Sequence, residues 1–241
     1  MIDDPLMTLL LAPILIPQGI YTRKVTPKLP EAEGERAGVL GSGKVLRLLI
    51  LGDSAAAGVG VDSQSKALSG NLLAKLSNDF LIDWRLEAES GVRTSEVIQK
   101  LESMNAFKTD VVLISLGVND VTSSIQLKAW LQQQEVLKAL LISKFKAKHI
   151  LMFSLPPMQD FPSLPQPLRW YLGRRSTLFN SELLKQSLLS ENLEFVPVSF
   201  PVKREYFADD GFHPSHLAYS LWSEVALKHI YHKLKGAGNL A

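Results

Sequence analysis

Apolar runs alternate along the chain with stretches whose apolar positions recur at helical spacing. Three runs, VLRLLIL, DVVLISL and HILMFSL, are continuous and β-prone, which is typical of strands covered by helices on both faces. We expect strands at residues 45–51, 83–89, 110–116, 149–155 and 193–198. We expect helices at residues 65–79, 94–103, 123–147, 168–190 and 214–235. This alternation predicts an α/β fold with one parallel sheet wound on both sides by helices.

The apolar segment at residues 6–20 does not fit this alternation. It is too short to predict a membrane-spanning helix, and Pro13 and Pro17 would interrupt any continuous helix there. Three interpretations of this segment remain open. It can pack on the protein as an arm, dock peripherally on a membrane, or span the membrane. Arg23 and Lys24 follow the segment, as they would at the edge of an interfacial anchor.

Residues 26–44 are rich in Pro, Gly and charge, which indicates a linker. We therefore expect an apolar arm and linker over residues 1–44 and one globular domain over residues 45–241. A chain of 241 residues with 46% hydrophobic residues can fill such a domain with a sizeable core.

Charge and cysteine content narrow the classes of function. The 26 basic and 24 acidic residues leave a net charge of +2, so there is no basic surplus for nucleic acid. The absence of cysteine excludes disulfides, thiolate metal sites and a cysteine nucleophile. The chain begins MIDD and shows no A-x-A cleavage pattern, so we expect a cytoplasmic protein, with peripheral membrane contact through residues 6–20 as an option. The oligomeric state stays open.

Polar residues and glycines follow the expected strands. In a parallel sheet the carboxyl ends of the strands meet at one edge, where ligands bind in such folds. The segments at this edge are Gly52-Asp53-Ser54, Ser90-Gly91, Gly117-Val118-Asn119-Asp120 and Asp210-Gly211-Phe212-His213-Pro214. Together they bring a hydroxyl, a carboxamide, carboxylates and an imidazole to one edge, which are the groups that acyl transfer requires.

Ser54 is the candidate nucleophile, and His213 is the candidate base that removes its proton. Asp210 lies three residues before His213, close enough to hold one imidazole nitrogen while the other faces Ser54. Asp209 is the alternative acid. His216 is the competing histidine, although its place inside the last helix favours a structural role.

Asn119 could stabilise an oxyanion through its carboxamide N–H, together with the backbone N–H groups of Ser54 and Gly91. An Asx turn at Asn119 is the alternative. We expect Asp53 and Asp120 to hold loop amides rather than to take part in the chemistry. The residues Ala55 to Gly58 favour clearance for an incoming acyl group.

The set G-D-S-x-x-x-G at 52–58, Gly91, G-x-N-D at 117–120 and D-x-x-H at 210–213 resembles the SGNH, or GDSL-type, serine hydrolases, from about residue 45 to about residue 232. The resemblance implies a flavodoxin-like, three-layer α/β/α fold with a five-stranded sheet. It also implies ester or thioester hydrolysis through an acyl-serine, with no metal or cofactor.

By that resemblance Ser54, Asp210 and His213 are catalytic, and Ser54, Gly91 and Asn119 form the oxyanion hole. The second block departs from the family pattern because no asparagine precedes Gly91, and Thr94 marks an alternative alignment.

The motifs do not choose a substrate. The proline-dense loop at 156–167 can supply an acyl pocket or simply pack on the sheet edge. Its candidate wall residues, counting the start of the next helix, are Met158, Phe161, Leu164, Leu168 and Trp170. We expect a carboxylic ester, with an acyl lipid or thioester favoured slightly. The alternatives are a carbohydrate O-deacetylase and a non-catalytic, doubly wound binding module that uses residues 52–60 to hold an anion.

Overall fold

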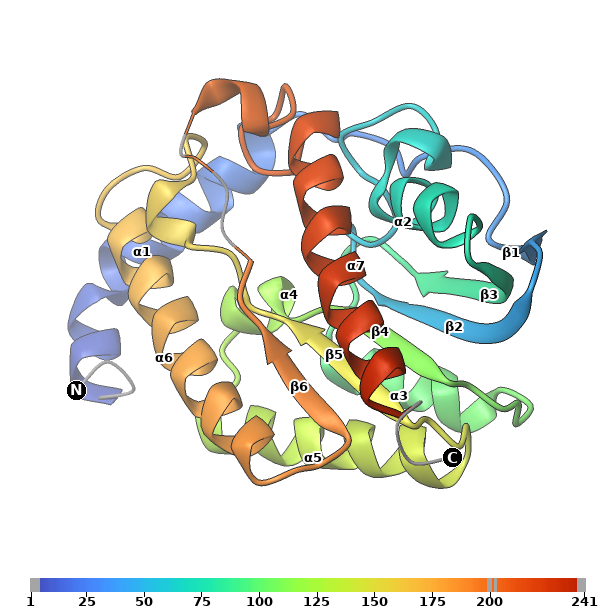
Figure 1. Cartoon of the computed structure of the whole chain (residues 1–241). Coiled ribbons are helices and arrows are strands. Elements are labelled where there is room, and N and C mark those ends of the chain that lie inside the picture. The colour runs from blue at the N-terminus through green and yellow to red at the C-terminus, as the bar shows by residue number, and fades with distance from the viewer. Residues whose placement is uncertain (1–4, 199–200, 202, 238–241) are drawn as a thin grey trace.

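The computed structural model describes residues 5–198, 201 and 203–237. Six strands form one sheet in the order β1-β3-β2-β4-β5-β6 (Figure 1). Their bounds are β1 Ala37–Gly41, β2 Lys44–Gly52, β3 Phe80–Ala88, β4 Val111–Ser115, β5 His149–Phe153 and β6 Leu193–Val196. Strands β2 to β6 run parallel, and β1 pairs antiparallel with the outer side of β3.

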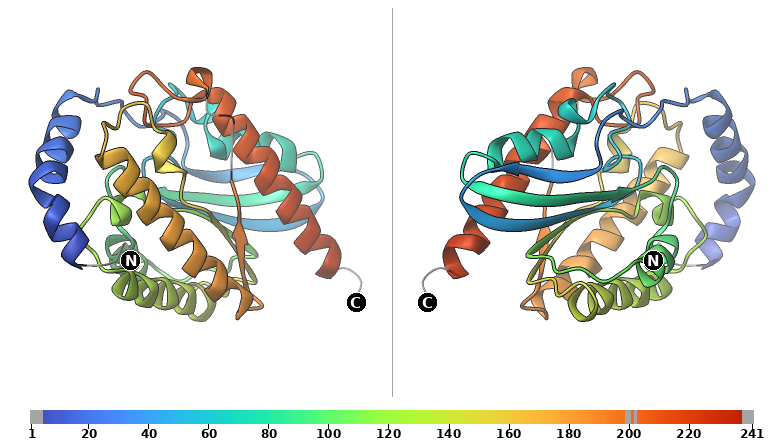
Figure 2. Two further views of the ribbon diagram at one scale, coloured as in Figure 1. Left: turned by 90° about the vertical axis from the view of Figure 1, so that its left-hand side faces the viewer. Right: turned by 90° about the vertical axis from the view of Figure 1, so that its right-hand side faces the viewer.

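Helices cover both faces of the sheet (Figures 1 and 2). The α-helices are α1 Pro5–Val25, α2 Leu68–Leu76, α3 Thr94–Ser103, α4 Val118–Val121, α5 Leu127–Ser143, α6 Leu168–Leu188 and α7 His216–Ala237. Short 3-10 helices are η1 Gln64–Lys66, η2 Met158–Asp160 and η3 Arg204–Tyr206. One buried cluster joins the sheet to α3, α5 and α6, and a second joins it to α2 and α7.

The central strand β2 shows why a strand covered by helices on both faces needs a continuous apolar run. Leu49 and Leu51 belong to the cluster under α3, α5 and α6, whereas Leu48 and Ile50 belong to the cluster under α2 and α7. Because side chains alternate between the two faces of a strand, both sets must be apolar when both faces are covered. The expected α/β fold is confirmed, with the five expected strands in one parallel sheet.

The sheet has one strand more than the sequence pattern indicated. Strand β1 lies within residues 26–44, for which the composition indicated a linker. All five of its residues are exposed and two of them are glycines, so it shows neither a buried apolar run nor an alternation of buried and exposed positions. Its position at the edge of the sheet explains this, since an edge strand with open faces needs no apolar side chains.

The expectation that Pro13 and Pro17 would interrupt a helix was wrong. Helix α1 runs without a break through both prolines. The missing N–H groups would have bonded the carbonyls of Leu9 and Pro13, and all of these residues lie on the exposed side of α1, where water can bond the carbonyls instead. Within residues 5–198, 201 and 203–237, no helix is long and apolar enough to cross a membrane.

The topology fixes where a ligand can bind. The chain leaves β2 toward β3 on one side and later continues from β4 to β5 and β6 on the other. A crevice therefore opens at the carboxyl ends of β2 and β4, where the winding direction reverses. Ser54 lies two residues beyond the end of β2.

Candidate active site

The turn after β2 is held tightly against the end of β4. The Asp53 N–H donates to the Ser115 carbonyl oxygen at 3.0 Å. A Cβ atom on Gly52 would lie 2.2 Å from that same oxygen, so only glycine fits there. This close approach fixes the position of Ser54 at the crevice between the two strands.

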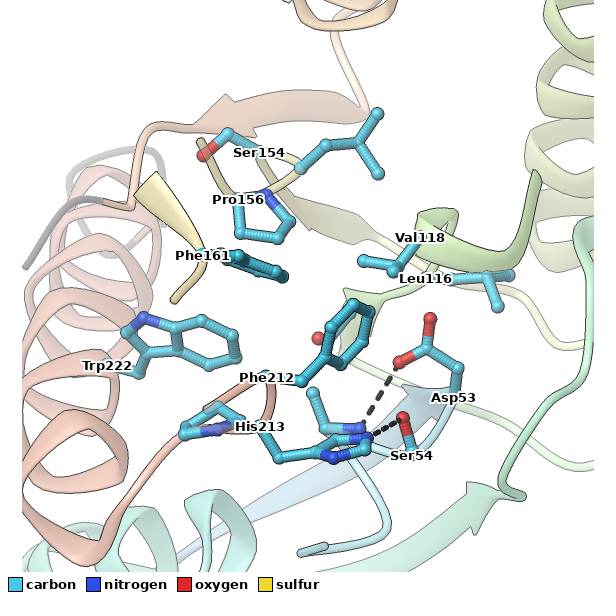
Figure 3. A pocket seen from close by; sticks show the side chains of 14 residues that line it. Asp53, Ser54, Leu116, Val118, Ser154, Pro156, Phe161, Phe212, His213 and Trp222 are labelled. Atoms are coloured by element: carbon cyan, nitrogen blue, oxygen red, sulfur yellow. Dashed lines mark hydrogen bonds between the residues drawn. The ribbon is translucent and has the colours of Figure 1, made fainter. Parts of the chain in front are cut away.

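Three side chains from the two ends of the domain form a hydrogen-bonded chain. The Ser54 Oγ lies 2.9 Å from His213 Nε2, and His213 Nδ1 lies 2.5 Å from Asp210 Oδ2. Figure 3 shows the Ser54 and His213 side chains pointing toward each other at the pocket. With Nδ1–H donating to the carboxylate, the Nε2 lone pair is left to accept the Ser54 proton.

The loop before α7 holds Asp210 in its ionised form. The Asp210 Oδ1 accepts the backbone N–H groups of Phe212 and His213, each at 2.9 Å. Burial raises the pKa of Asp210, but the hydrogen bonds from the His213 side chain and from these two amides outweigh it and lower the pKa below its ordinary value. A buried negative charge therefore stands beside the imidazole.

The competing residues lie elsewhere. The Asp209 carboxylate is fully exposed beside Arg204, and His216 is exposed at the start of α7. Asp209 is one position from Asp210, and His216 is three positions from His213. In each pair only one side chain joins the hydrogen-bonded chain that ends at Ser54, so the direction of the side chain decides which residue belongs to the site.

The segments after β3 and β4 lie together at the same edge. The Asn119 Nδ2 donates to the Val92 carbonyl at 2.9 Å, next to Gly91, whose φ is +85° in an exposed turn. The structure thus brings Gly91 and Asn119 side by side. Thr94 is buried and donates its N–H and hydroxyl to Asp120 Oδ2, so Asp120 supports this contact between the loops.

Glu31 adds a support that the sequence did not indicate. Its Oε1 accepts the Ser90 N–H at 2.6 Å, and its Oε2 accepts from Arg36 at 2.5 Å. Partial burial raises the pKa of Glu31, but the Ser90 and Arg36 bonds outweigh it, so the net pKa is lowered. The segment before β1 therefore holds the turn that carries Gly91.

Asp53 is buried under the candidate site. Its Oδ1 accepts the Ala55 N–H at 3.2 Å, and the Gly117 backbone lies near enough to favour the charged form of its carboxyl. Burial raises the pKa of Asp53 to about 6, although the Ala55 bond and the proximity of His213 act against this. Asp53 therefore links the turn after β2 to the turn after β4, as expected of a residue that holds loop amides.

The interpretation of Ala55 to Gly58 as clearance needs correction. Ala55 lines the pocket, but Ala56 and Ala57 are fully buried. A Cβ on Gly58 would lie 2.7 Å from Ala32 and 2.8 Å from Ala67, and φ is +83° there. Ala56, Ala57 and Gly58 therefore allow the turn to pack against the protein, and only Ala55 faces the pocket beside Ser54.

An apolar pocket extends from Ser54 and His213 toward the carboxyl ends of β4 and β5 (Figure 3). Its apolar wall consists of Ala55, Leu116, Val118, Leu155, Pro156, Phe161, Phe212, Pro214 and Trp222. Of the wall residues expected from the sequence, Phe161 lines the pocket. Met158, Leu164 and Leu168 are instead buried in the core on the α6 side, and Trp170 packs against that core. Phe212 and Trp222 were not expected in the wall, although each lies within nine residues of His213.

A family model described as the GDSL-like lipase/acylhydrolase family matches residues 50–221. No curated protein matches the chain. Several solved structures share its fold at low identity. A family 3 carbohydrate esterase from Clostridium thermocellum has a TM-score of 0.63 at 17% identity, over 80% of this chain and 99% of its own.

Two further structures have related descriptions. A member of the lipolytic protein G-D-S-L family from Veillonella parvula has a TM-score of 0.58 at 14% identity, over 76% of this chain and 97% of its own. A lipase/acylhydrolase from Enterococcus faecalis has a TM-score of 0.54 at 17% identity, over 78% of this chain and 96% of its own.

Proposed function

Because the chain belongs to the family of GDSL-like lipases and acylhydrolases, we propose that it hydrolyses carboxylic esters through an acyl-enzyme formed on Ser54. One observation carries the proposal, which is the hydrogen-bonded chain from Asp210 through His213 to Ser54 at the mouth of an apolar pocket. Two features support these roles, the buried carboxylate of Asp210 with its lowered pKa and the partly exposed hydroxyl of Ser54.

In the first step the Ser54 Oγ attacks the ester carbonyl carbon while its proton moves to His213 Nε2. Asp210 then faces an imidazolium and stabilises its positive charge through the Nδ1–H bond. When the tetrahedral intermediate collapses, the carbon–oxygen bond to the alcohol breaks and His213 gives its proton to the departing oxygen. A water molecule repeats the sequence on the acyl-serine and releases the acid.

The negative oxygen of the intermediate needs N–H donors. We assign these to the backbone N–H groups of Ser54 and Gly91 and to the Asn119 carboxamide. The Asn119 Nδ2 carries two hydrogens, and one of them is used by the Val92 carbonyl. That bond orients the carboxamide and leaves the second hydrogen for the substrate.

The pocket wall supports an apolar acyl group as the substrate class. Nine apolar side chains line it, and its polar lining comes from Asp53, Ser54, Ser115, Ser154 and His213. An acyl chain of an ester, lipid or thioester gains from burial against such a wall, at roughly 0.8 kcal/mol per CH₂. A sugar ring would leave its hydroxyl groups facing this wall without hydrogen-bond partners.

Two measurements test the proposal. Ser54→Ala should lower kcat for p-nitrophenyl esters by about 10⁴-fold or more, and a fluorophosphonate should label Ser54 in the folded protein. Ser63→Ala removes a half-buried hydroxyl nine positions away, which bonds Ser65 outside the pocket, and should retain full activity. Full activity of Ser54→Ala would contradict Ser54 as the nucleophile. A wild-type protein that neither hydrolyses any ester nor forms an adduct at Ser54 would favour a non-catalytic binding module.

A substrate panel then tests the acyl assignment. It compares p-nitrophenyl esters from acetyl to palmitoyl with a lysophospholipid, an acyl-CoA and an acetylated sugar. We expect kcat/KM to increase as the acyl chain lengthens beyond acetyl. A preference for the acetylated sugar over all acyl esters would instead identify a carbohydrate O-deacetylase.

A further inference from the structure

Helix α1 directs uncharged polar side chains toward the protein and apolar side chains toward the outside. Its buried stripe comprises Leu15 and Thr22, with Thr8, Leu11 and Gln18 partly buried beside them. The Thr8 Oγ1 lies 3.1 Å from the Tyr171 hydroxyl oxygen. The Gln18 side chain donates to the Gln166 carbonyl at 2.6 Å and accepts the Leu168 N–H at 3.0 Å. The uncharged polar side chains of Thr8, Gln18 and Thr22 therefore face the protein.

The opposite side of α1 is apolar and exposed. The exposed fractions are 70% for Leu9, 71% for Leu10, 50% for Ile14, 60% for Ile16, 64% for Ile20 and 64% for Tyr21. We call these six residues the outer face of α1. Pro13 and Pro17 are exposed among them. A helix on a protein surface normally turns its apolar side inward, so a continuous apolar face of this kind indicates a partner.

Charge indicates which kind of partner. Arg23, Lys24 and Lys28 are all exposed just beyond the outer face, and residues 5–30 contain no acidic side chain. Lys24 lies four positions after Ile20, so it continues the same side of the helix. An apolar face that ends in a group of cations fits a surface with acyl chains inside and negative head groups outside.

The helix also lies next to the pocket. Gln18 is bonded to residues 166 and 168, at the end of the loop that contributes Pro156 and Phe161 to the pocket wall. Figure 2 shows α1 along the outside of α6, with its C-terminal end at the edge where the loops before α6 and α7 gather. A surface bound by α1 would therefore lie close to this edge.

We propose that the outer face of α1 docks the protein on an anionic lipid surface. Helix α1 lies along the boundary between head groups and acyl chains, with its apolar side chains inserted and Arg23, Lys24 and Lys28 among the head groups. The docking does not depend on the ester chemistry, because none of these residues contacts Ser54, His213 or the pocket wall.

Vesicle co-sedimentation of the full chain tests the docking. The wild-type protein should bind phosphatidylcholine vesicles that contain phosphatidylglycerol, and it should bind phosphatidylcholine alone more weakly. The triple variant Leu10→Gln, Ile14→Gln, Ile20→Gln should lower the partition coefficient at least ten-fold. Arg23→Gln with Lys24→Gln should lower it roughly 25-fold on anionic vesicles at low salt, since each cation near such a surface contributes about five-fold.

A matched control is the triple variant Leu184→Gln, Leu188→Gln, Leu189→Gln at the far end of α6, where the side chains are 42%, 77% and 88% exposed. It should bind as the wild type does. Hydrolysis of a water-soluble ester should stay unchanged in all variants, which keeps this test separate from that of the proposed chemistry.

The docking is overturned if the wild type does not bind anionic vesicles, or if the α1 variants bind as strongly as the wild type. A dimer that the α1 triple variant converts to monomer, with no change in vesicle binding, would assign the outer face to a second copy of the chain.

Discussion

At the scale of single residues, the direction of a side chain decides between near neighbours. Asp209 and Asp210 are adjacent, yet one carboxylate is fully exposed and the other is fully buried against His213. The sequence could place both on the same loop, and the D-x-x-H spacing favoured Asp210. The burial that makes Asp210 an effective partner depends on the loop fold, in which Asp210 Oδ1 accepts two backbone amides.

This pair offers a matched test of the proposed chemistry. Asp210→Asn should lower kcat by about 10⁴-fold, because an amide neither fixes the imidazole tautomer nor stabilises the imidazolium. Asp209→Asn changes the adjacent exposed carboxyl and should leave kcat within two-fold of the wild type. Steady-state kinetics on a p-nitrophenyl ester at pH 7 measure both, and equal losses in the two variants would argue against a role for Asp210.

The burial of Asp53 raises the pKa of its carboxyl, an effect that neither the composition nor the motif predicts. Its pKa is raised from 3.8 to about 6 in the folded protein, so the folded state holds this proton more tightly than the unfolded chain does. The free energy of unfolding should therefore fall as the pH rises from about 4 to about 6, by about 3 kcal/mol at most for this group. Below pH 4 the carboxyl is protonated in both states and this penalty is absent.

Asp53→Asn should remove that pH dependence. Relative to the wild type, the variant should gain about 2–3 kcal/mol in free energy of unfolding between pH 4 and pH 7. Urea denaturation at several pH values measures the difference, in which the contributions of the other carboxyls cancel. A difference that stays constant from pH 4 to pH 7 would contradict a raised pKa at Asp53.

At the scale of elements, Gly60 in the turn after β2 packs against the loop that carries His213. Gly60 has a φ of +106°, and a Cβ there would lie 2.3 Å from the Pro214 carbonyl oxygen. The next residue along the chain from His213 thus packs directly against Gly60. This close packing against Pro214 could not be inferred from the sequence, because the two residues lie 154 positions apart.

Gly60→Ala should therefore lower the free energy of unfolding by about 2–4 kcal/mol and displace the loop of His213, with a matching loss of activity. Gly19→Ala is the control, since it lies within α1 and a Cβ there meets no atom within 4 Å. Alanine at that helical position should keep or raise stability, by up to about 1 kcal/mol. Thermal denaturation of the two variants, together with ester hydrolysis, distinguishes strain at Gly60 from a general effect of added methyl groups.

Helices and strands with a strong pattern could be predicted, and those set by their surroundings could not. Strands β2, β4 and β5 are continuous apolar runs, so they were expected at the positions where the structure has them. Strand β1 follows from pairing with the edge of β3, which leaves no trace in its own residues. Helix α1 holds two prolines because their partner carbonyls face the outside, and that direction is a property of the packed helix.

At the scale of the whole molecule, the parallel sheet explains why distant segments meet. Every loop that follows a parallel strand emerges at one edge, so the fold class alone predicts that Ser54, Asn119 and His213 lie near one another. The apolar pocket is less predictable, because its wall combines residues after β4, the loop after β5, the His213 loop and α7. Fold class indicates where the site lies, whereas packing decides what it can hold.

The separation of Ser54 and His213 along the chain also affects when the protein can be active. The two residues lie 159 positions apart, so at a synthesis rate of 5–20 residues per second Ser54 is made roughly 8–30 s before its base. Helix α7 must then pack beside α2, where the buried Tyr219 hydroxyl donates to the Val59 carbonyl at 2.7 Å and closes the turn after Ser54. A ribosome-bound chain that ends before residue 213 therefore carries an inert hydroxyl, and the onset of ester hydrolysis would report that the C-terminal helix has folded.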